Sequence, residues 1–174
     1  AVNRAMLTGG DMAEICRVSL LQAMSITHKW DDALAEEILH KEDAVDHYED
    51  VLGTYLVKLG NKHLSREDNR TVNKLLQTIG DFERISDHAV NLLEAAKEIK
   101  EKDIRFSKEA LSDLAVLESA LQDIVNRTVD AYQQNDLYAA GKIEPLEEVV
   151  DGLVREVKTR HIARLQAGTC TIEY

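Results

Sequence analysis

Three acidic pairs in the sequence share one spacing, a glutamate followed four positions later by an aspartate. The pairs are Glu42 with Asp46, Glu83 with Asp87, and Glu147 with Asp151. Residues four apart lie on one face of a helix, one turn above each other, and two like charges there repel. A helix that keeps such a pair therefore binds a cation, binds a cationic partner, or simply exposes the carboxylates to solvent.

Metal binding is the most specific chemistry that these pairs could perform. If the helix with Glu42 packs against the helix with Glu83, four carboxylates face each other and repel unless a cation lies between them. Oxygen ligands favour hard cations such as Mg²⁺, Mn²⁺ or iron. His88 and Asn91, close to the second pair, could add ligands. Solvation of an acidic helix face is the simpler alternative, because the whole chain is acidic.

Apolar residues around the second acidic pair recur every three or four positions, which predicts an amphipathic helix. They are Val72, Leu75, Ile79, Phe82, Ala89, Leu93 and Ala96. The same reasoning predicts long helices over residues 12–28, 33–59, 66–100 and 107–134, and a fifth that ends near residue 166. The predicted apolar stripe of the first helix is Ile15, Val18, Leu21 and either Met24 or Ser25, and that of the fourth is Leu114, Leu117, Leu121, Ile124 and Val129.

Short polar segments mark where these helices begin and end. The segment Thr8-Gly9-Gly10-Asp11 predicts the start of the first helix, with Asp11 as its N-cap. Asp31 or Asp32, then Ser65, then Ser107 are the expected caps of the next three helices. Pro145 predicts either a kink or the first turn of the fifth helix, and Gly168 its end.

Composition limits the class of protein. The chain has 174 residues, 44% of them hydrophobic and only 5% aromatic, which favours a single all-α bundle with an aliphatic core. Its net charge of -11 argues against nucleic-acid binding and against direct binding to anionic lipid. Cys16 and Cys170 have no partner at a recognisable spacing, so both are expected to be free thiols in a reducing cytosol.

An internal repeat emerges when the chain is shifted by 105 residues. This shift aligns Asp31 with Asp136, Ile38 with Ile143, Glu42 with Glu147 and Asp46 with Asp151. It predicts two units, a complete three-helix repeat over residues 1–106 and a second repeat over residues 107–174 that stops before its third helix. Two helices without a third would expose an apolar groove, so self-association is expected.

The sequence offers weaker support for an enzyme. A carboxylate-bridged di-metal oxidase of the ferritin-like class needs two Glu-x-x-His motifs in the bundle core, and only Glu37 with His40 matches. We find no Gly-rich phosphate loop, no His-Glu-x-x-His motif and no nucleophile in a recognisable context. A protein without catalytic residues is the preferred interpretation, and the oxidase is the rival class.

The segment from Asp81 to Asn91 closely resembles the signature of the PhoU family. The segments 41–46 and 144–151 resemble the matching motifs in the second helix of each repeat. This resemblance covers nearly the whole chain. It implies an antiparallel helical bundle of three-helix repeats and a phosphate-responsive regulator. It also implies that the six paired carboxylates could hold metal ions, namely iron, magnesium, manganese or zinc.

Two versions of this family are candidates. One is the cytoplasmic domain of a Na⁺/phosphate cotransporter-related protein, tethered to the inner membrane by an upstream transmembrane domain that would be its partner in cis. The loop over residues 64–68 resembles this version more closely, and the start at Ala1 fits a fragment. The alternative is a free-standing regulator of the phosphate ABC transporter and its two-component system, whose partners would be transporter and sensor proteins.

Overall fold

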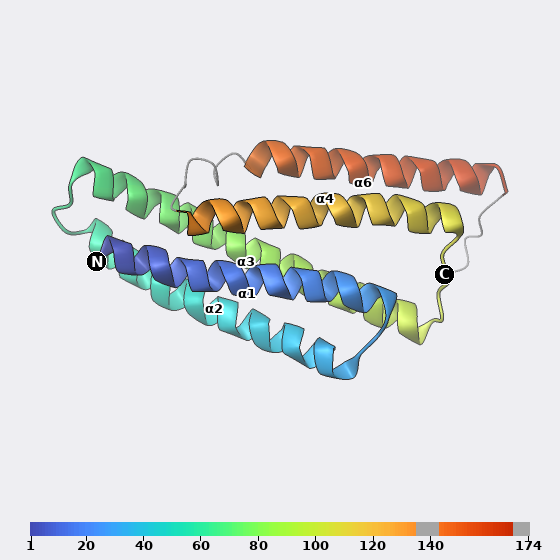
Figure 1. The fold of residues 1–174 in the computed structure, drawn as a ribbon, viewed down its shortest axis with the longest axis horizontal. Coiled ribbons are helices and arrows are strands. Elements are labelled where there is room, and N and C mark those ends of the chain that lie inside the picture. Colours follow the sequence, from blue (N-terminus) through green and yellow to red (C-terminus); the bar gives the residue numbers. More distant parts are fainter. Residues whose placement is uncertain (135–142, 169–174) are drawn as a thin grey trace.

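The computed structural model describes residues 1–134 and 143–168, apart from the side chains of residues 143–151, 153, 154 and 157. The described helices are α1 (Val2–His28), α2 (Asp32–Gly60), α3 (Arg66–Glu101), α4 (Lys108–Gln133) and α6 (Ile143–Gln166). Successive helices run antiparallel (Figure 1), and this part of the chain contains no strand. The predicted all-α bundle is confirmed.

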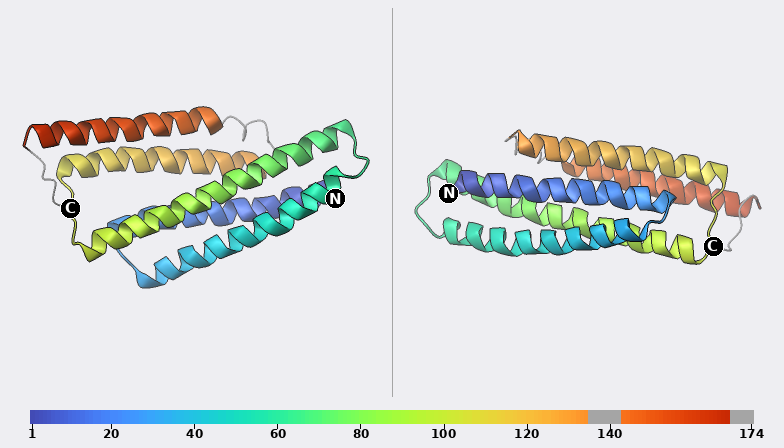
Figure 2. Two further views of the ribbon diagram at one scale, coloured as in Figure 1. Left: turned by 180° about the vertical axis from the view of Figure 1, so that it is seen from behind. Right: turned by 60° about the horizontal axis from the view of Figure 1, so that its bottom comes forward.

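The helices form two layers (Figures 1 and 2). α1, α2 and α3 pack against one another as a three-helix unit, α4 packs on α1, and α6 packs on α4. Residues 102–107 connect the unit to α4, and Asp103 within this connection has a left-handed backbone with φ of 49°. The connection ends where the sequence predicts the second repeat to begin, although the division into two repeats stays a prediction.

Side-chain caps fix three of the helix starts as predicted. The carboxylate of Asp31 accepts hydrogen bonds from the backbone N–H of Ala33 and Leu34 at the start of α2. The hydroxyls of Ser65 and Ser107 cap α3 and α4 in the same way. Such caps satisfy N–H groups that have no partner within the helix.

The start predicted for α1 is wrong. The helix begins at Val2 and continues through Gly9 and Gly10, which sequence reasoning assigned to a turn. Gly9 is buried, and a Cβ atom placed on it would lie 2.1 Å from the hydroxyl oxygen of Tyr132 in α4. The glycine is therefore a packing residue that lets α4 approach α1 closely, which explains a glycine inside a helix.

The predicted apolar stripe of α3 forms the centre of the core, since all seven of its residues are buried. The stripe predicted for α1 is wrong except at Met24. α2, α3 and α4 surround α1, so its buried set extends around the helix: Ala5, Gly9, Met12, Ala13, Cys16, Ser19, Leu20, Ala23, Met24 and Ile26. Cys16 is a buried unpaired thiol, whereas Cys170 lies outside the described residues.

The stripe predicted for α4 is correct only at Val129. The buried residues of this helix are Val125, Thr128, Val129 and Tyr132, all in its C-terminal half. The predicted leucines are only partly covered, because α4 contacts the unit mainly through α1. Pro145 lies in the first turn of α6, where proline is tolerated, and Gly168 follows the end of α6 with φ of 70°.

Candidate metal centre

The structure brings together the first two acidic pairs, as the sequence predicts. α2 and α3 lie side by side in antiparallel directions (Figure 1), so Glu42 and Asp46 face Asp87 and Glu83 across the gap between the helices. Further carboxylates lie on the same surface. We define the acidic face by the residues Glu42, Asp46, Glu49, Glu83, Asp87 and Glu94.

The tightest group on the acidic face consists of Asp46, Glu49 and Glu83. One carboxylate oxygen from each of these residues lies within 4.8 Å of the other two. Asp46 is exposed, whereas Glu49 and Glu83 are partly buried. Three oxygens at these separations could converge on one cation with small adjustments of side-chain rotamers.

Core residues hold these carboxylates in place. Asp46 follows the buried Val45, and Glu83 follows Phe82, one of the largest fully buried side chains. The Sγ atom of Cys16 donates a hydrogen bond of 3.3 Å to the carbonyl oxygen of Phe82, which ties this turn of α3 to α1. The backbone beneath the acidic group is therefore fixed by packing on both sides.

Burial and neighbouring negative charges make two carboxylates of the acidic face, Glu42 and Glu83, easier to protonate. Desolvation raises the pKa of Glu83 to about 7, with further contributions from a hydrogen bond with Asp87 and from the charges of Asp87, Glu49 and Asp46. Desolvation also raises the pKa of Glu42, and the negative charges of Asp46 and Asp87 add to this effect. A bound cation would remove the repulsion and favour the ionised carboxylates.

Sequence reasoning missed Glu49. Only the spacing of four residues was considered, whereas Glu49 follows Asp46 by three residues and so lies on the same face of α2. The complete signal is the series Glu42, Asp46, Glu49. Conversely, His88 and Asn91, which could have added ligands, are exposed, and His88 does not belong to the group.

The donor set fits a hard cation. All three ligand groups are carboxylates, with no imidazole or thiolate among them. Oxygen donors favour Mg²⁺, Ca²⁺, Mn²⁺ or iron over softer metals, so zinc is the least suited of the metals that the sequence suggests.

The third acidic pair lies on a different helix from this group. Glu147 and Asp151 lie on α6, which packs on α4 and is separated from α2 by the rest of the bundle (Figure 2). Their side chains lie outside the described residues, so metal binding by this pair stays a prediction.

The oxidase alternative gains no support from its single motif. His40 is exposed, and so is Glu37, whose carboxylate accepts a hydrogen bond of 2.9 Å from Gln22 and lies 3.8 Å from the ammonium group of Lys41. A di-metal centre in a bundle core needs inward-facing ligands.

None of the described helices contains an apolar stretch long enough to cross a membrane.

Comparison with known proteins places the chain in a family. The family described as "PhoU domain" matches residues 10–96, half of the chain and a region that includes Glu42, Asp46, Glu83 and Asp87. One similar protein is the phosphate-specific transport system accessory protein PhoU homolog of Clostridium acetobutylicum, 25% identical over 87% of this chain and 68% of the relative. Another is PhoU homolog 1 of Thermotoga maritima, 21% identical over 89% of this chain and 66% of the relative. This chain therefore belongs to the PhoU family.

Proposed function

We propose that this protein is a non-enzymatic regulator of phosphate transport that acts through contacts with other proteins. The observation that carries this proposal is the PhoU match over residues 10–96, which spans α2 and most of α1 and α3. The proposed partners are components of a phosphate transporter or the sensor proteins that report phosphate supply.

The accessory-protein version of the family is the better supported of the two candidates. Both similar proteins are named as accessory proteins of a phosphate-specific transport system, and neither name refers to a Na⁺-coupled cotransporter. The chain spans about two thirds of the length of each. We therefore favour the accessory protein over the tethered cotransporter domain that the loop at residues 64–68 suggests.

Charge distribution supports a cationic binding partner. Counted from Asp31, the N-cap of α2, to Val51, the chain has nine acidic residues and one basic residue, Lys41, so this segment carries most of the net charge of -11. Concentrated charge of one sign accelerates association with an oppositely charged surface. A basic surface on the transporter or sensor is the complement that α2 would recognise.

We also propose that the acidic face binds a hard cation through Asp46, Glu49 and Glu83, with Glu42 and Asp87 beside the site. Such a cation would screen the repulsion between α2 and α3 and fix the shape of the surface offered to a partner. Isothermal titration of the chelator-treated protein with Mn²⁺, Mg²⁺ and Fe²⁺ tests this proposal. Saturable binding to the wild type, lost in the Asp46→Asn/Glu83→Gln variant, is the expected result.

A matched control is available on the same helix. Asp50 is an exposed carboxylate next to Glu49 that does not belong to the ligand group. The Asp50→Asn variant should keep the affinity of the wild type. Equal weakening by both substitutions would show general attraction to an acidic surface and would argue against a defined site.

The regulatory function itself is tested by removing the gene. In the organism that encodes this protein, deletion should disturb the repression of phosphate uptake when phosphate is abundant, measured with radiolabelled phosphate. Expression of the protein from a plasmid should restore the repression. Unchanged uptake in the deletion strain, over low and high phosphate, would contradict the proposal.

Self-association is a further part of the proposal. Phe106, Leu111, Val116 and Ile162 are large apolar side chains that remain exposed on or next to α4 and α6. Exposed apolar side chains that gather on one part of a surface favour association. Multi-angle light scattering should show a dimer or larger species in the micromolar range, and a strict monomer at high concentration would contradict this expectation.

A further inference from the structure

α4 is attached to the three-helix unit at its C-terminal end. The ring of Tyr132 is buried there and meets Phe82 of α3 edge-on, with 5.4 Å between the ring centroids. The hydroxyl of Tyr132 donates a hydrogen bond of 2.8 Å to the backbone carbonyl of Met6 in α1. One side chain thus joins α4 to two helices of the unit.

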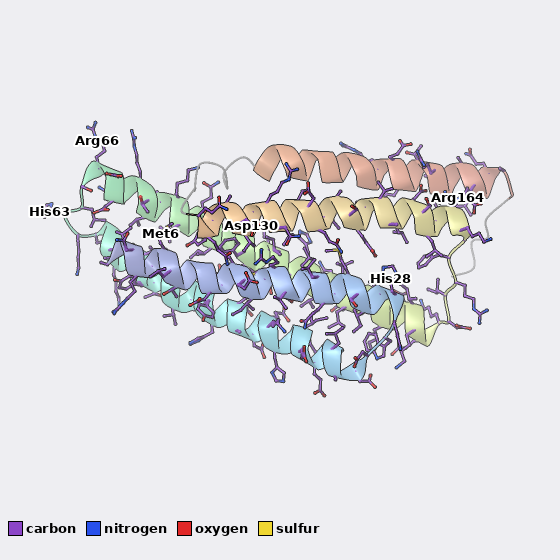
Figure 3. All side chains as sticks on the ribbon, viewed as in Figure 1. Met6, His28, His63, Arg66, Asp130 and Arg164 are labelled. Carbon is purple, nitrogen blue, oxygen red and sulfur yellow. The ribbon has the colours of Figure 1, made fainter. Side chains whose placement is uncertain are left out.

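Polar contacts reinforce this attachment. Nη1 of Arg17 donates a hydrogen bond of 2.9 Å to Asp130, and Nε2 of Gln133 donates one of 3.0 Å to Glu14. Arg17 also pairs with Glu14 within α1. Met6 and Asp130 both lie toward the end of α4 that leads to residue 133 (Figure 3). We call residues 125–133 of α4 the anchor.

The other half of α4 is held much more weakly. None of the residues from Lys108 to Ile124, all of which the structure describes, is buried, although Leu121 packs partly against the core. Leu111 and Val116 are 47% and 57% exposed. Among the described residues, one hydrogen-bonded contact joins this half of α4 to the unit, between Nε2 of His28 and the carboxylate of Glu118 at 2.8 Å.

The weakly held half of α4 also extends beyond the end of α1. Because α1 ends at His28, opposite Glu118, the first turns of α4 project past the end of α1 (Figure 1). α6 is joined to this projecting part, since Arg160 and Arg164 each donate a hydrogen bond to Asp113, at 3.0 and 3.1 Å. Asp113 is only 11% exposed, so α4 and α6 form a coherent pair.

We propose that α4 and α6 move together as an arm that pivots about the anchor, and that the contact between His28 and Glu118 opens and closes as the arm moves. A single, partly exposed polar contact contributes little to stability, whereas burial of the apolar residues of the anchor contributes much more. Small sliding or hinging motions between packed helices are a common form of conformational change. The motion would alter the surface shared by α1 and α4 and would leave the acidic face on α2 and α3 unchanged.

Distances between spin labels on the full chain test this inference. The open-end pair is Ser112→Cys in α4 with Ala95→Cys in α3, and the anchored-end pair is Asn126→Cys in α4 with Gln77→Cys in α3. All four positions are exposed. Cys170 is replaced by serine in every variant, and a parent with only the buried Cys16 reports background labelling. The open-end pair should give a distance distribution at least about twofold broader than the anchored-end pair.

Substitution of one carboxylate then tests the role of the contact between His28 and Glu118. Glu118→Gln should broaden the open-end distribution further and leave the anchored-end distribution unchanged. Asp123→Asn is the matched control, because Asp123 pairs with Arg127 of the same helix rather than with the unit. Equal widths at the two ends would overturn the proposal, and so would identical effects of Glu118→Gln and Asp123→Asn.

Discussion

At the scale of one residue, Glu83 shows how burial and neighbouring charges on the acidic face make the stability of the folded protein depend on pH. Its pKa of about 7 lies above the ordinary value of 4.5, mainly because the carboxylate is desolvated and also because Asp87, Glu49 and Asp46 surround it. The folded state therefore holds a proton that the unfolded chain releases between these two values. Linkage makes the ionisation of Glu83 destabilising as the pH rises through this interval.

The first prediction concerns this pH dependence. The contribution of Glu83 to stability is greatest below pH 4.5 and is lost as the pH rises through about 7. The Glu83→Gln variant should lose less free energy of unfolding than the wild type between pH 5 and pH 7.5, measured by urea denaturation without metal ions. Parallel pH profiles for the two proteins would show that the desolvated carboxylate does not titrate in this range.

The second prediction concerns Gly9. A methyl group at this position would lie 2.1 Å from the Tyr132 hydroxyl oxygen, so Gly9→Ala should destabilise the protein by about 1–3 kcal/mol through overpacking. Gly80→Ala is the control, since no atom outside its own helix lies within 4 Å of the added methyl group, and it should stabilise the protein by about 0.5–1 kcal/mol. Chemical denaturation measures both changes.

A double substitution tests the cause of the Gly9 effect. Tyr132→Phe removes the hydroxyl that meets the new methyl group, together with the hydrogen bond to Met6. Gly9→Ala should therefore cost less in the Tyr132→Phe background than in the wild type. A strictly additive double mutant would mean that the clash lies elsewhere.

At the scale of elements, Asp113 joins α4 to α6. Because this carboxylate pairs with both Arg160 and Arg164 and is nearly buried, Asp113→Ala should cost about 1.5–3 kcal/mol. Hydrogen exchange of the amides in residues 152–168 should accelerate, while exchange in α1–α3 stays slow. Unaltered exchange in α6 would show that apolar packing alone holds it to α4.

Helix positions were largely predictable because local signals determine them. Asp31, Ser65 and Ser107 act as caps as expected, and the spacing of apolar residues in α3 predicts its buried face correctly. The start of α1 was not predictable, because a glycine that marks a turn and a glycine that admits a tyrosine from a distant helix look alike in sequence. Only the position of Tyr132 distinguishes the two.

The candidate site was predictable in part for the same reason. Spacing within a helix identifies Glu42, Asp46, Glu83 and Asp87, and antiparallel packing of neighbouring helices brings the pairs together. The ligand group itself, Asp46 with Glu49 and Glu83, depends on the register between α2 and α3. That register follows from side-chain packing along the interface, which spacing along a single chain does not encode.

At the scale of the whole molecule, the acidic face belongs to α2 and α3, whereas the second layer of α4 and α6 packs on α1 (Figure 2). If the acidic face binds a cation or a partner and the arm pivots as proposed, the unit keeps these two properties apart. The PhoU match over residues 10–96 covers most of the unit.

The central claim is that the acidic face serves the regulation of phosphate transport, and phosphate uptake in a deletion strain tests it most directly. The strain is complemented with the wild type, with the Asp46→Asn/Glu83→Gln variant, or with the Asp50→Asn control, at equal protein levels. The wild type and Asp50→Asn should restore the repression of radiolabelled phosphate uptake at high phosphate, and the double variant should not. Full repression by the double variant would contradict the claim.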